Sequence, residues 1–291
     1  MDMIQGIRKM AVPAKDPAGR QVSVIYETRA INIAATHSCS LQDVYVNALK
    51  SEVWPSRYLR NRDSVSINDQ IRLAESRVGV VGAGGLGGHV CLLLARIGVG
   101  LLRVIDHDDF DETNLNRQAL SDLAKTGKSK AETAASTLGS VNPAVKVTPV
   151  IRRINEENAE DLLNGLDVVV DALDNVRTRF VIAVAARRLN IPLVHGAVAG
   201  FEGRVMTIFP EDQGFERLYG ARDSLDTHTP SPEALLGVPS ITPAIIAALQ
   251  TMEVLKIILD RGRLLRNRMG YMDLEKCRLE LFSFDSKGVE K

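Results

Sequence analysis

The chain has 291 residues, of which 45% are hydrophobic and 25% charged, and its 36 basic side chains balance 36 acidic ones. A neutral chain has no field that would draw it to nucleic acid or to an anionic membrane surface, so neither is expected as a partner. The longest apolar run, residues 241–259, is not expected to span a membrane, because it is interrupted by Pro243, Gln250, Glu253 and Lys256. Length and composition fit one α/β domain with additions.

Cysteine usage and the N-terminal sequence predict a cytoplasmic protein. The three cysteines, Cys39, Cys91 and Cys277, are widely separated and form no CxxC pair. Neither a zinc site nor a disulfide framework is therefore expected. Residues 1–20 carry charges and prolines where a signal peptide needs an apolar stretch.

Residues 1–56 are predicted to form an N-terminal arm or a small ββα extension. Residues 21–26 alternate as a β-strand does, and residues 31–33 are the expected hairpin partner. Ser40 and Asp43 then have the spacing of a capping box, which predicts that a helix begins there.

A glycine-rich turn between a strand and a helix dominates the middle of the chain. A valine-rich strand runs into a turn with four glycines, Gly82, Gly84, Gly85 and Gly87. Glycines let the backbone approach a ligand closely, and the free N–H groups at the start of the helix predicted for residues 89–97 favour a phosphate. The next strand, residues 100–106, ends on Asp106, at about the distance expected for an acid that binds a ribose hydroxyl. This unit predicts a nucleotide site, but such turns serve NAD, FAD and ATP alike.

An acid-rich stretch, residues 106–118, follows this strand and lacks the apolar period of a helix face. Lys128 and Lys130 then open a helix predicted for residues 131–138. Two lysines in a first turn oppose the helix dipole, and a nearby anion would resolve that conflict. Two exposed lysines on a surface helix are the alternative.

Asp174 is predicted to lie at the carboxyl end of a parallel strand. A strand at residues 145–151 and a short helix at residues 156–163 precede the strand at residues 167–173. Open α/β sheets bind ligands at this edge, which favours a binding role for Asp174. A helix-capping role is the alternative, and it would be preferred if the residue stood alone.

Together these residues resemble a known family. The motifs occur in order and at compatible spacing: Gly82-Ala-Gly-Gly-Leu-Gly87, Asp106-His-Asp108, Asn114-Leu-Asn-Arg-Gln118, Lys130, Asn142-Pro143, Asp171-Ala-Leu-Asp-Asn175 and Thr178-Arg179. Arg57-Tyr-Leu-Arg60 adds an RYxR element before the first strand. From about Arg57 to Leu259 the chain resembles the HesA/MoeB/ThiF family, relatives of ubiquitin-activating enzymes. The resemblance implies a doubly wound α/β domain at residues 57–291, with a mostly parallel Rossmann-like sheet and an antiparallel C-terminal extension.

The resemblance also implies a role for each matching residue. The Gly85 backbone would approach the phosphates of ATP, and Asp106 would bind the ribose hydroxyls. The triphosphate would be held by Asn114, Arg117 and Lys130, which would offset the charge that builds during attack at the α-phosphate. Asp174 would hold Mg²⁺, with Asn175 steadying its loop. Arg60 would reach the site of the neighbouring subunit of a homodimer.

The C-terminal third departs from the family pattern. Glu233 stands where many members of the family carry a reactive cysteine, which argues against a covalent thioester or persulfide on this chain. The zinc-binding CxxC pairs of many relatives are also missing. His195 is expected to be a strand residue satisfied by backbone partners rather than a catalytic one. Residues 243–259 are predicted to form an apolar helix, either in the core or at a dimer interface, and the resemblance favours the dimer.

The predicted function is ATP- and Mg²⁺-dependent adenylation of the C-terminal glycine of a ubiquitin-like sulfur-carrier protein, of the thiamine or molybdopterin type. Three alternatives remain at this point: an NAD-dependent oxidoreductase, an enzyme that adenylates another carboxylate such as a peptide or a tRNA-attached amino acid, and a non-catalytic carrier-binding relative. Arg117, Lys130 and Asp174 count against the oxidoreductase. The sequence does not name the carrier or the pathway.

Overall fold

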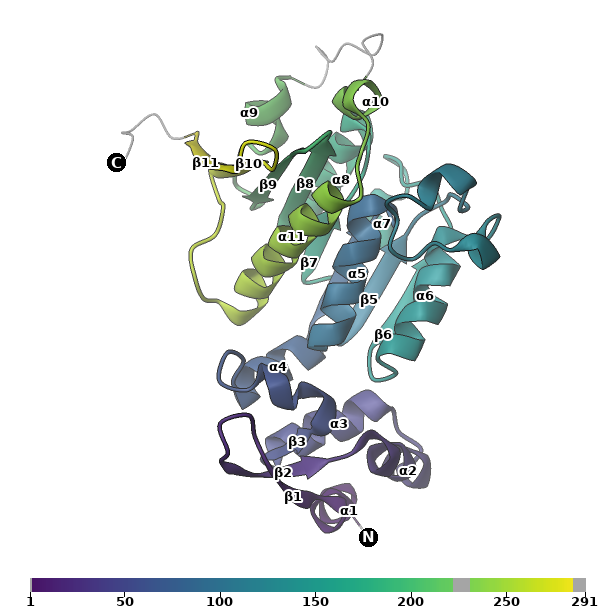
Figure 1. Ribbon diagram of the computed structural model, residues 1–291, viewed down its shortest axis with the longest axis vertical. Helices are drawn as coiled ribbons and strands as arrows, with labels where there is room; N and C mark the ends of the chain where they lie inside the picture. The colour runs from purple at the N-terminus through teal and green to yellow at the C-terminus, as the bar shows by residue number, and fades with distance from the viewer. Residues whose placement is uncertain (1, 222–230, 285–291) are drawn as a thin grey trace.

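The computed structural model describes residues 2–221 and 231–284, which contain two β-sheets. A large sheet has the strand order β11-β10-β9-β8-β7-β4-β5-β6, and a small N-terminal sheet has the order β1-β2-β3. The small sheet lies below the large one in Figure 1, beyond the helix α4 (Ile67–Glu75).

The parallel part of the large sheet is formed by five consecutive strands. They are β4 (Arg77–Val81), β5 (Leu101–Ile105), β6 (Lys146–Val150), β7 (Val168–Asp171) and β8 (Leu193–Ala199). The order 8-7-4-5-6 reverses between β4 and β7, because the chain first builds outward through β5 and β6 and then returns to the other side of β4. This is the doubly wound arrangement that the sequence predicts, and its ligand-binding edge lies at the reversal.

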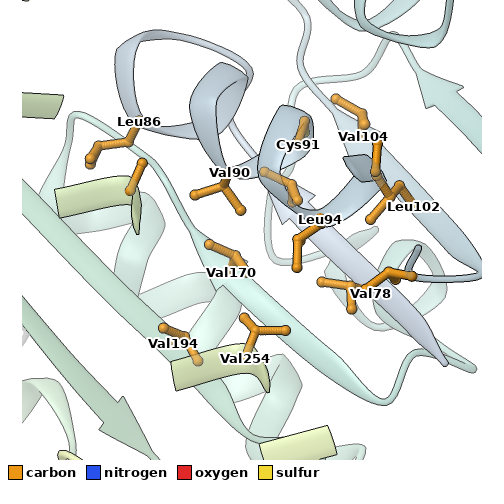
Figure 2. Packing of buried hydrophobic residues seen from close by; sticks show 14 of the residues in the cluster. Val78, Leu86, Val90, Cys91, Leu94, Leu102, Val104, Val170, Val194 and Val254 are labelled. Carbon is orange, nitrogen blue, oxygen red and sulfur yellow. The ribbon is translucent and has the colours of Figure 1, made fainter. Parts of the chain in front are cut away.

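Helices cover both faces of this sheet because its strands are apolar on both sides. The helices α5 (Gly85–Ile97), α6 (Lys130–Val141) and α11 (Ile241–Leu259) pack on one face, and α7 (Ala159–Leu163) and α8 (Val176–Arg188) pack on the other. Figure 2 shows side chains of α5 and α11 packed against valines of the strands. Val90 and Leu94 come from α5, Val254 from α11 and Val170 from β7. All four are fully buried.

The predicted antiparallel extension is present. Three strands continue the sheet from β8, each antiparallel to the one before: β9 (Glu202–Ile208), β10 (Arg268–Asp273) and β11 (Arg278–Ser283). Two short helices, α9 (Phe215–Tyr219) and α10 (Pro232–Leu236), lie between β9 and α11 in the chain.

The long helix α11 is apolar enough, and at 19 residues long enough, to cross a membrane by length and composition alone. Half of it is buried against α5, β8 and β9, however, and its polar side chains are used there. Glu253 accepts a hydrogen bond from the Thr207 hydroxyl at 2.6 Å, and Gln250 donates to the Asp171 carbonyl at 2.8 Å. These hydrogen bonds are typical of a core helix in an α/β domain, which is one of the two predicted alternatives for α11.

The N-terminal region corrects one prediction. Residues 31–33 are not a strand but lie in α2 (Glu27–His37), because Ala30, Ile33 and Ala34 face the core at helical spacing. The hairpin partner of β2 (Gln21–Ile25) is instead β1 (Val12–Lys15), and β3 (Val53–Pro55) pairs with β2 in parallel. The capping box of Ser40 and Asp43 does begin α3 (Leu41–Lys50), and α1 (Met3–Met10) completes the unit.

A tyrosine joins this N-terminal unit to the large sheet. Tyr58, in the 3₁₀ turn η1 (Ser56–Asn61), is buried with its hydroxyl at the C-terminal end of α5. Asn142 Nδ2 donates to this hydroxyl at 2.8 Å, and also to the Ala95 carbonyl at 2.7 Å. Gly98 leaves the space, since a Cβ there would lie 2.5 Å from the Tyr58 hydroxyl oxygen.

Candidate nucleotide-binding site

A cavity of about 400 Å³ opens at the carboxyl ends of β4, β5 and β7. This volume is within the range of small-molecule and cofactor sites. Its lining brings together most of the residues that the sequence singles out: Gly82, Gly84, Gly85, Asp106, Arg117, Lys130, Asp174 and Asn175. The polar residues come from separate loops, so only the doubly wound topology places them in one cavity.

The glycine-rich turn forms the floor of the cavity at the start of α5. Gly82 has a φ of +93°, and a Cβ there would lie 2.6 Å from the Ala172 carbonyl oxygen. A Cβ on Gly87 would lie 1.8 Å from the Gly82 carbonyl oxygen, so these two glycines are needed for the turn itself. The helix starts at Gly85, four residues earlier than predicted, and no side chain of the described residues caps it. Its first N–H groups are thus available to an anion.

Gly85 differs from Gly87 because its position has room for a methyl group. The nearest atom to a Cβ there would be Pro243 Cβ, at 3.5 Å. We expect Gly85→Ala to fold with an unchanged unfolding midpoint but to bind ATP more weakly, because its methyl group occupies the surface that a phosphate would approach. Gly87→Ala should lose roughly 1–3 kcal/mol of stability, the usual cost of overpacking. Thermal denaturation and ATP titration of both variants check this, and equal ATP affinity of Gly85→Ala and wild type would refute the phosphate role.

Asp106 is held rigidly at the end of β5. Its Oδ2 accepts a hydrogen bond from the Ala83 N–H at 2.7 Å, and its Oδ1 accepts one from the Asp108 N–H at 2.8 Å. The side chain therefore ties the glycine turn to the loop that follows β5. It is almost fully buried, but it still borders the cavity.

Two cations border the cavity on the side of that loop. Lys130 is the first residue of α6 and is nearly buried, and its Nζ pairs with Asp108 Oδ2 at 3.2 Å. The Asp108 carboxylate is thus an anion that offsets the unfavourable position of Lys130 at the positive end of the helix dipole. Arg117 is bound by its own loop, since it donates to the Thr113 carbonyl and to Asn116 Oδ1, each at 2.9 Å. Both cations are thus held in place at the cavity by local partners, and the charge of Lys130 is paired with Asp108.

Asp174 lies beyond the end of β7, exposed to the cavity. Its Oδ1 accepts a hydrogen bond from Asn175 Nδ2 at 3.2 Å. Asn175, rather than Asp174, is the N-cap of α8, because its Oδ1 accepts from the Thr178 N–H at 2.9 Å. The capping role that competes with a binding role for Asp174 thus belongs to its neighbour.

A carboxylate with this exposure fits Mg²⁺, which takes few protein ligands and completes its shell with water and phosphate oxygens. Asp106, His107 and Asp108 also have ligand atoms within 4.8 Å of one another at the cavity edge. Asp106 already accepts two backbone hydrogen bonds and Asp108 pairs with Lys130, so Asp174 is the less engaged carboxylate.

Several residues that line the cavity have no role assigned from the sequence. The buried Oε1 of Gln118 has no hydrogen-bond partner among the described residues, and the side chain borders the cavity beside Gly84. Such a buried acceptor needs a donor, which water or a ligand in the cavity can supply. Arg152, Arg153 and Arg179 also line the cavity. Arginines after the strand β6 have no motif around them, so nothing in the sequence distinguishes the first two from surface residues.

Three predicted site residues do not line the cavity. Gly87 lies beneath the turn, and Asn114 is buried in its own loop, where its Oδ1 accepts from the Asp111 N–H at 3.2 Å. Arg60 is exposed on η1, next to the C-terminal end of α5, whereas the cavity is at the N-terminal end. This helix of 13 residues is about 20 Å long. That span exceeds the reach of an arginine, so Arg60 cannot serve the cavity of its own chain.

His195 and the cysteines lie away from the expected chemistry. His195 is fully buried, and its partners are side chains rather than the expected backbone groups: Asp171 Oδ2 at 2.7 Å and the Tyr219 hydroxyl at 3.4 Å. Burial lowers the pKa of His195, although Asp171 acts in the opposite direction. None of the three cysteines lines the cavity, and burial raises the pKa of the Cys91 thiol to about 12.

The fold and the cavity define a nucleotide-binding protein of the doubly wound α/β class. The model of the ThiF family matches residues 58–288, and the chain belongs to that family. A SAMP-activating enzyme E1 from Haloferax volcanii is 39% identical over 219 residues, which are 75% of this chain and 80% of that protein. An adenylyltransferase and sulfurtransferase MOCS3-2 from Zea mays is 35% identical over 78% of this chain. The match covers 46% of that protein, so the chain spans about half its length.

The solved structures agree on the fold. The crystal structure of E. coli MccB with ATP has a TM-score of 0.66 at 20% identity, and the match covers 79% of this chain and 72% of that one. Because relatives of this chain are named as adenylyltransferases and activating enzymes, adenylyl transfer is the reaction class that family membership gives it.

Proposed function

We propose that this protein is an ATP- and Mg²⁺-dependent adenylyltransferase that activates the C-terminal carboxylate of a ubiquitin-like sulfur-carrier protein. The observation that carries the proposal is the single cavity that joins a free helix N-terminus, Lys130, Arg117 and Asp174. Cations and a metal-binding carboxylate beside a phosphate site are the parts that attack on an α-phosphate requires. The names of the relatives support a protein or peptide carboxylate as the acceptor.

The residues divide the work by position. Asp106 would bind the ribose, and the N–H groups of Gly85 and its neighbours would bind the phosphates. Asp174 would bind the metal ion. Bound Mg²⁺ would supply charge neutralisation at the phosphates. Lys130 and Arg117 would stabilise the negative charge that develops as the carrier carboxylate attacks and pyrophosphate leaves. The sulfur chemistry of the carrier is proposed to take place elsewhere, because Glu233 borders the cavity where a cysteine would be needed.

ATP rather than NAD is the proposed nucleotide, because the cations Lys130 and Arg117 line the same cavity as the glycine turn and Asp174. Titration calorimetry is expected to show binding of ATP with Mg²⁺ and no comparable binding of NAD. Tight NAD binding without ATP binding would restore the oxidoreductase alternative. Mg²⁺ rather than zinc is proposed because the donors are carboxylate oxygens and the three cysteines lie apart, and elemental analysis tests it.

The decisive assay is exchange of labelled pyrophosphate into ATP. We expect exchange only when a candidate carrier with a free C-terminus is present, and none with a carrier that lacks its last glycine. Carriers of the thiamine and molybdopterin types can be compared directly. ATP binding without exchange by any carrier would favour the non-catalytic alternative, and exchange driven by a short peptide would favour a different carboxylate substrate.

We also propose a homodimer, with residues 57–291 as the adenylation domain and the cytoplasm as its compartment. The face of α11 that points away from the sheet is apolar and exposed at Ile241, Leu249 and Met252. A second copy that covered this face would bury it, and we propose that the same copy supplies Arg60 to the cavity. Three free cysteines fit a reducing compartment.

A further inference from the structure

The peptide of Leu173 is held at both of its polar atoms. Its N–H donates to Asp171 Oδ1 at 3.0 Å, and its carbonyl accepts from a terminal nitrogen of Arg179 at 2.7 Å. Leu173 is the residue directly before Asp174. One peptide bond therefore separates this doubly hydrogen-bonded residue from Asp174, whose carboxylate is exposed.

The groups that hold Leu173 are buried and connected. The side chains of Asp171 and His195 are fully buried, and that of Arg179 is 3% exposed. Asp171 Oδ2 accepts from His195 Nδ1 at 2.7 Å and lies 3.5 Å from Arg179 Nε. Burying three such groups away from water is costly unless each finds partners.

Tyr219 closes these groups into a ring, in which hydrogen bonds lead from Arg179 through Tyr219 and His195 to Asp171 and an ion pair joins Asp171 back to Arg179. Arg179 donates to the Tyr219 hydroxyl at 2.8 Å, the hydroxyl faces His195 Nε2 at 3.4 Å, and His195 Nδ1 faces Asp171. A neutral histidine protonated at Nδ1 donates to Asp171, and its Nε2 can then accept from the tyrosine. Arg179 Nε makes no hydrogen bond among the described residues and is paired with Asp171 only by charge.

The ring is anchored to the sheet and approached from the cavity. Gln250 of α11 donates to the Asp171 carbonyl at 2.8 Å, and Gly196 makes room, since a Cβ there would lie 2.3 Å from Gln250 Cδ. On the cavity side, Glu233 Oε1 lies 3.7 Å from Arg179. The ring is thus contacted both from α11 in the core and from the cavity.

We propose that Asp171, Arg179 and His195 are positioning residues, which fix the peptide before Asp174 and so aim its carboxylate at the metal–nucleotide complex. This inference rests on the proposed metal role of Asp174. Groups that orient a metal-binding residue typically change metal affinity or activity by roughly 10–100-fold when they are lost. A purely structural ion pair would affect stability and leave metal dependence alone.

The test is ATP titration by calorimetry, with Mg²⁺ and with EDTA, on Arg179→Lys and on the matched control Arg188→Lys. Arg188 is exposed at the far end of α8 and pairs with Glu160 away from the cavity. Lysine keeps the charge but is shorter and replaces by one nitrogen the two terminal nitrogens that bind Leu173 and Tyr219 separately. We expect Arg179→Lys to keep its metal-free ATP affinity within twofold and to lose roughly 10–100-fold of the affinity that Mg²⁺ adds. An equal loss with and without Mg²⁺ would instead mean direct contact with ATP, and no loss would also overturn the proposal.

A pair of variants at His195 decides the question if Arg179→Lys does not fold. Asparagine retains an N–H that can reach Asp171, whereas leucine retains none. His195→Asn should therefore keep more of the Mg²⁺-dependent affinity than His195→Leu, and equal behaviour of the two would contradict the proposal. Asp174→Asn separates the two levels of inference. If it keeps the full effect of Mg²⁺, the metal role fails; if it loses the effect while both the Arg179 and the His195 variants keep it, only the positioning role fails.

Discussion

Asp174→Asn is expected to abolish adenylation while leaving the fold intact. The side chain is exposed to the cavity, and asparagine preserves its shape and its contact with Asn175, so the unfolding midpoint should not change. What disappears is the negative charge that would hold Mg²⁺ against the phosphates. Loss of one well-placed electrostatic group costs on the order of 10²–10³ in rate. Carrier-dependent pyrophosphate exchange measures the loss.

The control is Asp161→Asn, which removes an exposed acid from α7, outside the cavity lining. Its exchange rate should equal that of wild type, which excludes a general effect of net charge. If Asp174→Asn itself stays within a few-fold of wild type with a normal melting curve, the metal ion is held elsewhere. Asp106 and Asp108 at the other edge of the cavity would then be the next candidates.

The glycine turn and the strand-end acids were predictable from the sequence because local chemistry determines them. Only glycine adopts the φ of +93° at position 82 readily, and a valine-rich strand before it leaves few alternatives to a buried βαβ unit. Asp174 was predictable because it directly follows a buried parallel strand, and ligands bind at the carboxyl ends of such strands. These predictions use interactions between residues close in sequence, and the family resemblance then linked the separate pieces.

The features that the sequence did not predict depend on the rest of the fold. Ile31 and Ile33 alternate as in a strand, but the helix α2 forms because Ala30, Ile33 and Ala34 bury together against the N-terminal core. Asn114 belongs to a motif, and yet its side chain is occupied within its own loop. The ring around Arg179 joins β7, β8, α8 and α9, and no spacing in the sequence indicates that these four elements meet.

Arg60→Ala and Lys130→Ala are each expected to be inactive alone and to regain activity when their subunits are mixed. Arg60 and the cavity of its own chain lie at opposite ends of α5, which is about 20 Å long, so its proposed role requires the cavity of a second copy. In a mixed dimer, one cavity contains Lys130 of its own chain and Arg60 of the other, and it has neither defect. The second cavity contains both defects. Random exchange of subunits should therefore restore about a quarter of the sites, as two-fold symmetry requires.

The control mixture combines Lys130→Ala with Asp174→Asn. Both residues line the same cavity, so no mixed dimer contains an intact site, and activity should not return. Subunit exchange is verified by mixing differently tagged wild-type chains and recovering both tags together. Recovery in the Arg60 mixture but not in the control mixture would establish a shared site between copies. If the mixture of Arg60→Ala and Lys130→Ala stays inactive despite proven subunit exchange, Arg60 is not part of the site. The exposed face of α11 would then be the remaining support for a dimer.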